Sequence, residues 1–158
     1  MGAVRKGRFA AEIEGDFVVL VIGMRFNKPW AVHRWAPIAK AFTAMVKHLG
    51  THPELGCLGV EQAFGRTTIS VQYWRDFESL RRFARDPGLP HAEPWRRFNR
   101  LVADSGDVGV YHETYLVKDG AYEAIYTNLP PFGLAAASSL VPVARRGESA
   151  SARLGLPD

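Results

Sequence analysis

The apolar run Phe17-Val-Val-Leu-Val-Ile-Gly-Met24 decides how this chain of 158 residues folds. Its side chains are hydrophobic at both odd and even positions, which is typical of a strand that is covered on both faces of its sheet. The run is far too short to span a membrane, and the polar residues before it do not resemble a signal peptide. We therefore expect a buried strand over residues 17–27.

The residues that follow this strand predict alternating elements. Hydrophobic side chains at helical spacing predict a helix over residues 33–49, which Gly50 ends. A hairpin comes next, and in its second strand Ser70, Gln72 and Trp74 share one face. Asp76 is placed to cap a second helix. The elements expected after that are a third helical segment over residues 91–102 and two adjacent strands over residues 109–117 and 120–128.

The order strand, helix, strand, strand, helix, strand is the split βαβ arrangement of a ferredoxin-like α+β domain. We expect a single domain of this kind over residues 17–143. A polar N-terminal arm over residues 1–16 precedes it, and an irregular C-terminal extension ends in a flexible tail over residues 144–158. Two helices cover only one face of a sheet, so the doubly apolar first strand also predicts a homodimer that forms through the other face.

Composition limits the partners of the protein. There are 20 Lys and Arg against 16 Asp and Glu, and the basic residues are scattered along the chain. Nucleic-acid binding needs a basic stripe or a recognised module, so we expect no nucleic-acid partner, and we also expect no membrane partner. Cys57 is the only cysteine, which excludes an internal disulfide and a thiolate-rich zinc site. A protein of this composition suits the reducing cytoplasm, and we expect a cytoplasmic location.

Residues 109–128 carry the candidate catalytic groups. His112, Glu113 and Tyr115 lie in the first of the two expected strands, and Tyr122 and Tyr126 lie in the second. Ionisable groups in a strand of core composition cost free energy unless they are paired or used. The alternative is that His112 is a hydrogen-bonded structural residue, and the sequence favours neither interpretation. Strand alternation places His112 on the face opposite Glu113 and Tyr115.

Four further motifs are specific in combination. They are Gln72-Tyr-Trp-Arg-Asp-Phe77, Pro94-Trp-Arg-Arg-Phe-Asn-Arg100, Gly109-Val-Tyr-His-Glu-Thr-Tyr115 and Asn128-Leu-Pro-Pro-Phe-Gly-Leu134. These motifs resemble a bacterial and fungal family that is named after a monooxygenase of fumagillin biosynthesis and is assigned to the dimeric α+β barrel superfamily. The resemblance spans residues 17–143, and one difference is that Tyr111 stands where the family pattern has Trp.

The resemblance implies a dimer whose two sheets face each other, with a pocket between sheet and helices in each protomer. Some relatives oxidise anthrone or quinol-type polyketides without a cofactor, whereas others degrade haem or dehydrate aldoximes on haem iron. In the haem-degrading branch a histidine after the third strand binds iron, which corresponds to His91, and an asparagine on the first strand corresponds to Asn27. The tryptophan of that branch is replaced here by Phe83, which argues against haem degradation.

A neutral histidine can remove a proton from a phenol or an activated C–H group, so His112 is the candidate base, with Tyr115 or Tyr122 to orient it. We expect His112, Tyr115, Trp74 and Tyr122 to border one cavity, with Asn27 and His91 at its mouth. For Trp74 the sequence favours the simpler interpretation, a packing residue in contact with Trp95. Residues 130–134 are either a rigid lid or a packing segment. Further expected substrate-binding residues on the pocket wall are Trp95, Phe98 and Tyr126.

Three functions therefore remain open. The first is a small monooxygenase-like enzyme that oxidises an aromatic or polyketide-type molecule without a cofactor. The second is a haem-binding enzyme with His91 or His112 as the axial ligand, because imidazole is a common ligand of haem iron. The third is a non-catalytic dimer that binds a hydrophobic small molecule, because a fold alone does not fix a function.

Overall fold

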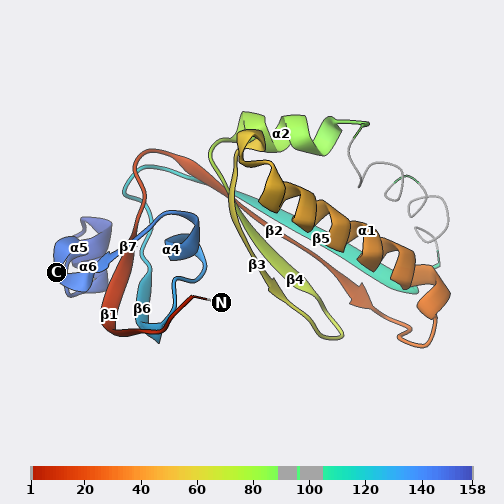
Figure 1. The fold of residues 1–158 in the computed structure, drawn as a ribbon, viewed down its shortest axis with the longest axis horizontal. Helices are drawn as coiled ribbons and strands as arrows, with labels where there is room; N and C mark the ends of the chain where they lie inside the picture. The colour runs from red at the N-terminus through yellow and green to blue at the C-terminus, as the bar shows by residue number, and fades with distance from the viewer. Residues whose placement is uncertain (1, 89–95, 97–104, 158) are drawn as a thin grey trace.

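The computed structural model describes residues 2–88, 96 and 105–157. Its larger sheet, here called the core sheet, has the antiparallel strand order β3-β4-β2-β5. Two helices lie on one face of this sheet (Figure 1), and we call that the helix-facing face and the other the open face. The elements are β2 (Phe17–Phe26), α1 (Val32–Thr51), η1 (Pro53–Leu55), β3 (Cys57–Ala63), β4 (Ile69–Trp74), α2 (Phe77–Arg85) and β5 (Val108–Val117).

This topology confirms the predicted ferredoxin-like α+β fold. Strand β4 lies between β2 and β3, so α1 connects two strands that are not neighbours, as the split βαβ arrangement requires. The helical segment expected over residues 91–102 lies outside the described residues, apart from residue 96. Among the described residues, no helix is long and apolar enough to cross a membrane.

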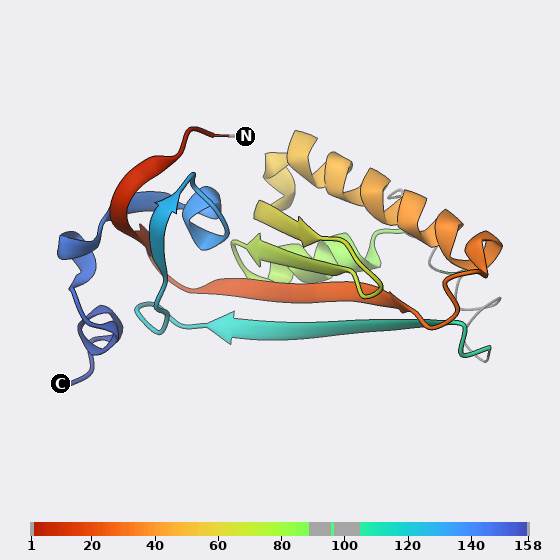
Figure 2. The same cartoon turned by 90° about the horizontal axis from the view of Figure 1, so that it is seen from below.

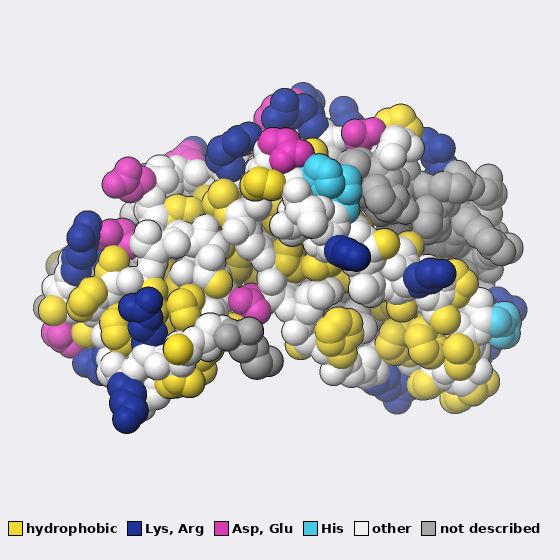
Figure 3. Space-filling view, viewed as in Figure 1, with side chains coloured by type: hydrophobic (Ala, Val, Ile, Leu, Met, Phe, Trp, Pro, Cys, Tyr) yellow, Lys and Arg dark blue, Asp and Glu magenta, His cyan; other side chains and the backbone are white. Residues whose placement is uncertain are grey.

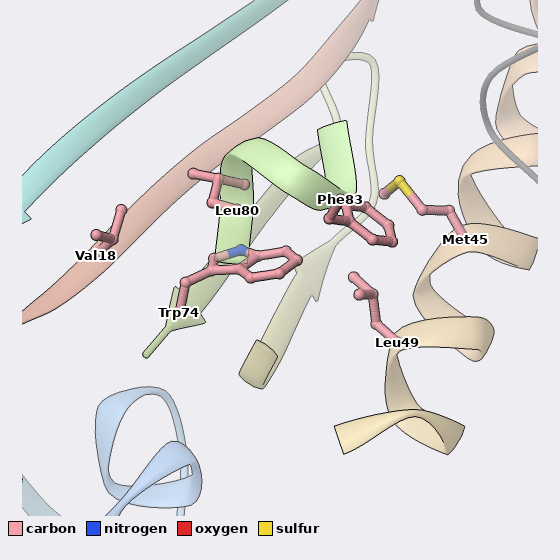
Figure 4. Close-up of a cluster of buried hydrophobic side chains, with 6 residues drawn as sticks. All are labelled: Val18, Met45, Leu49, Trp74, Leu80 and Phe83. Carbon is pink, nitrogen blue, oxygen red and sulfur yellow. The ribbon is translucent and has the colours of Figure 1, made fainter. Parts of the chain in front are cut away.

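The main core lies between the helices and the core sheet (Figure 4). Trp74 is fully buried at its centre, and its ring lies 5.2 Å from that of Phe83 between centroids. The capping prediction is also confirmed, because Oδ1 of Asp76 accepts a hydrogen bond of 2.6 Å from the Ser79 amide. The buried members of this cluster are Val18, Met45, Leu49, Trp74, Leu80 and Phe83.

A second sheet, here called the small sheet, has the strand order β6-β1-β7 and lies beside the first (Figure 2). Its strands are β1 (Arg5–Glu12), β6 (Ile125–Leu129) and β7 (Ser139–Pro142). Residues 1–16 were expected to form a polar arm, but residues 5–12 form the central strand of this sheet. The pairing partners of β1 lie more than 110 residues away in the chain, which local pattern does not reveal.

The C-terminal residues also form regular structure where a flexible tail was expected. They contain the short helices α5 (Val143–Arg146) and α6 (Ala150–Leu154). Arg153 of α6 is 7% exposed, and its Nε donates a hydrogen bond of 2.7 Å to Oε1 of Glu123. Its Nη1 also donates to the carbonyls of Gly147 and Glu148. A buried, multiply bonded guanidinium explains why this segment is ordered.

The strands expected over residues 109–117 and 120–128 are not neighbours. Strand β5 pairs with β2 in the core sheet, whereas β6 begins only at Ile125 and pairs with β1 in the small sheet. Helix α4 (Leu134–Ala137) then packs against β3, where Ala137 occupies the space that a side chain at Gly59 would need. Residues 118–137 therefore connect the two sheets instead of extending the first.

Loss of the Asp76 cap has a definite stability cost. We expect Asp76→Ala to lower the free energy of unfolding by about 1 kcal/mol, because the Ser79 amide loses its acceptor at the start of α2. Asp76→Asn is the matched control, because asparagine caps a helix as well as aspartate does. Denaturant unfolding measures both, and equal losses in the two variants would contradict a capping role.

Candidate functional site

The pairing of β5 with β2 sets the direction of every candidate side chain on β5. Residues that face each other across an antiparallel pair lie on the same side of the sheet. His112 faces Ile22, and Ile22 faces Ser70 of β4, so this row lies on the helix-facing face together with Trp74. Glu113 faces Val21 and therefore lies on the open face. The structure thus separates His112 from Glu113 and Tyr115, as strand alternation predicted.

His112 lies on an edge strand and its side chain is exposed. Val110 and Leu116 on the same face of β5 are also exposed, at 38% and 65%, so the imidazole lies in an apolar strip beside the covered part of the sheet. Among the described residues no hydrogen bond to His112 is found. The interpretation of His112 as a hydrogen-bonded core residue is therefore not supported.

Glu113 and Tyr115 form a pair on the open face. The Tyr115 hydroxyl donates a hydrogen bond of 2.6 Å to Oε2 of Glu113, and this bond raises the pKa of the phenol above its usual value. Tyr111 lies on the same face, where its hydroxyl donates to the Thr68 carbonyl at 3.0 Å. Its ring fits against Gly23, since a side chain at that position would collide with both the Tyr111 ring and the Thr68 carbonyl oxygen. Gly23 thus allows Tyr111 to reach the neighbouring hairpin.

The expected pocket residues are dispersed over separate parts of the molecule. Trp74 is in the main core, which agrees with the packing interpretation. Tyr122 is buried near the small sheet, where its hydroxyl bonds the amide and the carbonyl of Ile13. Asn27 donates to the Gly106 carbonyl at 3.0 Å. The structure does not bring His112, Tyr115, Trp74 and Tyr122 together at one cavity. His91, Trp95 and Phe98 lie outside the described residues.

Tyr126 takes part in a cluster that holds the start of α4. Its hydroxyl accepts a hydrogen bond from the Ala135 amide at 3.3 Å, while Oε1 of Glu61 accepts one from the Gly133 amide at 2.9 Å. Burial raises the pKa of Tyr73 and of Tyr126, and the Glu61 carboxylate raises both further. Leu134 is buried. Residues 130–134 therefore lead into a helix whose first residue is buried. This supports the interpretation of the segment as a packing element and not as a lid.

A cavity of about 410 Å³ lies near the junction of the two sheets. Its charged groups are largely used in ion pairs, since Glu12 pairs with Arg145, Asp16 with Lys118 and Arg75 with Asp76. None of the predicted catalytic or substrate-binding residues borders it. The lining residues are Glu12, Ile13, Glu14, Asp16, Phe17, Leu58, Arg75, Ala137, Ser138 and Ser139.

Two residues on β4 stand out that the sequence did not single out as functional. Ser70 and Gln72 are each 1% exposed and lie on the helix-facing face. Oγ of Ser70 and Nε2 of Gln72 have no hydrogen-bond partner in the part of the chain that the structure describes, although almost all buried polar atoms in proteins have one. The only signal in the sequence is that two polar residues alternate with apolar ones in a strand that ends in a buried tryptophan.

The described residues do not fit a haem group. His112 is exposed and does not border the cavity described above. The other candidate axial ligand, His91, lies outside the described residues.

Comparison with known proteins agrees with this fold. Monooxygenase af470 of Aspergillus fumigatus is 34% identical over 154 residues, which cover 83% of this chain and 54% of that protein. This chain thus spans about half the length of that relative. The crystal structure of an aldoxime dehydratase matches with a TM-score of 0.69 at 19% identity, over 89% of this chain and 45% of that one. SnoaB, a cofactor-independent oxygenase from Streptomyces nogalater, matches with a TM-score of 0.41 at 15% identity, over 68% of this chain and 96% of that one.

The fold and the aldoxime dehydratase match define a ferredoxin-like α+β protein. Residues 17–134 match the family described as Monooxygenase af470-like, and the chain belongs to that family. The match begins at the first residue of β2 and ends at the first residue of α4, so it contains the whole core sheet.

The two buried phenols predict a stability that falls at high pH. Because burial raises the pKa of Tyr73 and Tyr126, they ionise more readily in the unfolded chain than in the folded one. Their contribution is complete below pH about 10 and is lost as the pH rises through the raised values. We expect the unfolding free energy of the Tyr73→Phe/Tyr126→Phe double variant to fall less steeply with pH than that of the wild-type protein. Denaturant titrations at several pH values between 9 and 11 measure this slope. A slope unchanged from wild type would contradict this.

Proposed function

We propose that this chain is a small monooxygenase-like enzyme that oxidises an aromatic or polyketide-type molecule with molecular oxygen and without a cofactor. Membership of the Monooxygenase af470-like family supports the class of reaction. The observation that carries the site is the exposed imidazole of His112, which has no described hydrogen-bond partner and lies in an apolar strip on the helix-facing face. Such an imidazole is available as a base beside a surface that an aromatic ring can contact.

The chemistry requires little from the protein beyond a base and an apolar surface. His112 removes a proton from a C–H group that a neighbouring carbonyl or phenol makes acidic. The resulting carbanion gives an electron to O₂, and recombination forms a carbon–oxygen bond. Loss of water then leaves a carbonyl, so that a CH₂ group and O₂ become C=O and H₂O. The substrate supplies every electron, which is why no redox cofactor is needed.

The open face is less suited to this role. Glu113, the only predicted base on that face of β5, is already bound to the Tyr115 hydroxyl. Tyr111 is likewise bound to the Thr68 carbonyl. Glu113 and Tyr115, which the sequence predicts as catalytic residues together with His112, therefore belong in this proposal to the surface through which two copies associate.

The role of His112 is tested with anthrone as a probe in air-saturated buffer. We expect oxygen consumption and anthraquinone formation with the wild-type protein, and a decrease of about 10²-fold or more in kcat for His112→Ala, since general base catalysis typically contributes that much. His33→Ala, on α1, is the matched control and is expected to retain wild-type activity.

Two results would contradict this proposal. Equal oxidation rates for His112→Ala and the wild-type protein would remove the assigned base. Activity that depends on added haem, together with a Soret band that His112→Ala abolishes, would replace the cofactor-free reaction with a haem reaction.

We further propose a homodimer that forms through the open face. This face carries apolar side chains that remain partly exposed to solvent in a single copy of the chain, including Ile69 at 42% and Tyr115 at 52% exposure. Val19 and Val21 of the central strand lie between them and are also incompletely buried. A strand of this composition is stable only when both of its faces are covered. Self-association covers such a face in the way that symmetric oligomers commonly do.

Adjacent residues of β5 provide a matched test of the dimer. We expect Tyr115→Lys to shift the protein from dimer to monomer in light scattering at micromolar concentration, because it places a charge in the proposed interface. Leu116→Lys alters an even more exposed apolar residue on the opposite face and is expected to leave the dimer intact. A wild-type protein that is monomeric would remove the proposal.

A further inference from the structure

We infer that Ser70 and Gln72 form a receptor for an oxygen atom of the substrate, and that they select aromatic molecules that carry a ketone, quinone or phenolate oxygen. This inference rests on the proposed function and deepens it, since it specifies the chemical class of the substrate. It begins from the two buried polar atoms on β4 that lack a hydrogen-bond partner.

The hydrogen-bonding character of this pair is fixed by Trp74. An indole nitrogen can only donate, and the indole N–H of Trp74 donates to Oε1 of Gln72 at 3.1 Å inside the core. The amide of Gln72 is therefore oriented so that its NH₂ group is the part left without a partner. The Ser70 hydroxyl is the nearest polar group on the same face of the strand, two residues away, and it can also donate. Two buried donors side by side suit a ligand atom that accepts.

The position of the pair relative to His112 limits the size of the ligand. Ser70, Ile22 and His112 form one row across β4, β2 and β5. Neighbouring strands are about 4.8 Å apart, so the ends of this row lie about 10 Å from each other. A ligand that lies over Ile22 and spans this row, with a hydrogen-bond length of about 3 Å at each end, is about as long as one six-membered ring. The oxygen and the reacting carbon are then on opposite sides of the same ring, as they are in anthrone.

Binding of a substrate oxygen also explains why Ser70 and Gln72 are present in the core, where their polar atoms are unfavourable. A buried polar atom without a partner destabilises the fold, and nothing within residues 2–88 and 105–157 compensates for these two. Ser79 is a useful contrast, because it is buried to the same 1% exposure but its Oγ accepts a hydrogen bond from Nη2 of Arg75 at 3.0 Å. A buried polar residue that stabilises the fold has a hydrogen-bond partner, as Ser79 does. A buried polar residue that binds a ligand lacks such a partner in the free protein, as Ser70 does.

Binding of two water-soluble probes tests the inference without requiring turnover. Anthraquinone-2-sulfonate and anthracene-2-sulfonate have the same ring skeleton and charge, but only the first carries carbonyl oxygens. We expect the wild-type protein to bind the quinone at least tenfold more tightly in a fluorescence titration. Ser70→Ala and Gln72→Leu are each expected to weaken quinone binding by about fivefold or more, and to leave anthracene-2-sulfonate binding unchanged.

Ser79→Ala is the control for a buried hydroxyl, and it is expected to lower stability without changing the preference between the probes. Ser70→Ala is expected to raise the midpoint of denaturant unfolding while it weakens quinone binding, a combination that a structural serine would not produce. Equal binding of the two probes by wild type, or a preference that persists in both Ser70→Ala and Gln72→Leu, would overturn the inference.

The result remains separable from the proposed reaction. His112→Ala is expected to keep the wild-type preference for the quinone while it loses anthrone oxidation. If the preference exists and depends on Ser70 and Gln72 but the wild-type protein does not oxidise anthrone, the receptor stands and the proposed reaction fails. If anthrone is oxidised but the two probes bind equally, the reaction stands and the receptor fails.

Discussion

The antiparallel pairing of β2 with β5 on one side and β4 on the other is the interaction on which the rest of the structure depends. The pairing with β5 extends over all ten residues of each strand without a bulge. It fixes which side chains of three strands share a face, because a shift of one residue would exchange the two faces completely. His112 and Ser70 lie in one row only because both face Ile22. The same register directs Glu113 and Tyr115 to the opposite side.

This division of faces gives the two sides of the core sheet different physical tasks. The helix-facing face buries Trp74 and its neighbours under α1 and α2, and it also contains the Ser70 and Gln72 atoms that have no hydrogen-bond partner among the described residues. The open face is partly covered by α4 and otherwise presents apolar side chains outwards. Basic residues occur at separate places on the molecular surface and form no continuous stripe on the face shown in Figure 3. The two sides of the core sheet therefore differ in what covers them.

The small sheet shows how the two ends of the chain stabilise each other. Strand β1 pairs with β6 and β7, and the buried Arg153 of α6 connects to Glu123 in the segment before β6. The cluster of Glu61, Tyr73 and Tyr126 then holds α4 against the core sheet. Residues of the small sheet and of the core sheet contribute to this cluster, so the cluster fixes the position of the small sheet relative to the core sheet. Neither periodicity nor composition marks these contacts, because each depends on residues that are far apart in the sequence.

The sequence by itself determined the order of the core elements, the cap at Asp76 and the separation of His112 from Glu113, since periodicity and alternation are local properties. The family resemblance was likewise present in the residues, and the comparisons confirm it. Only the tertiary structure decided that residues 5–12 form a strand, that β6 leaves the core sheet and that Arg153 is buried. It also decided which polar residues matter on β4, because a missing hydrogen-bond partner is a property of the surroundings and not of the residue.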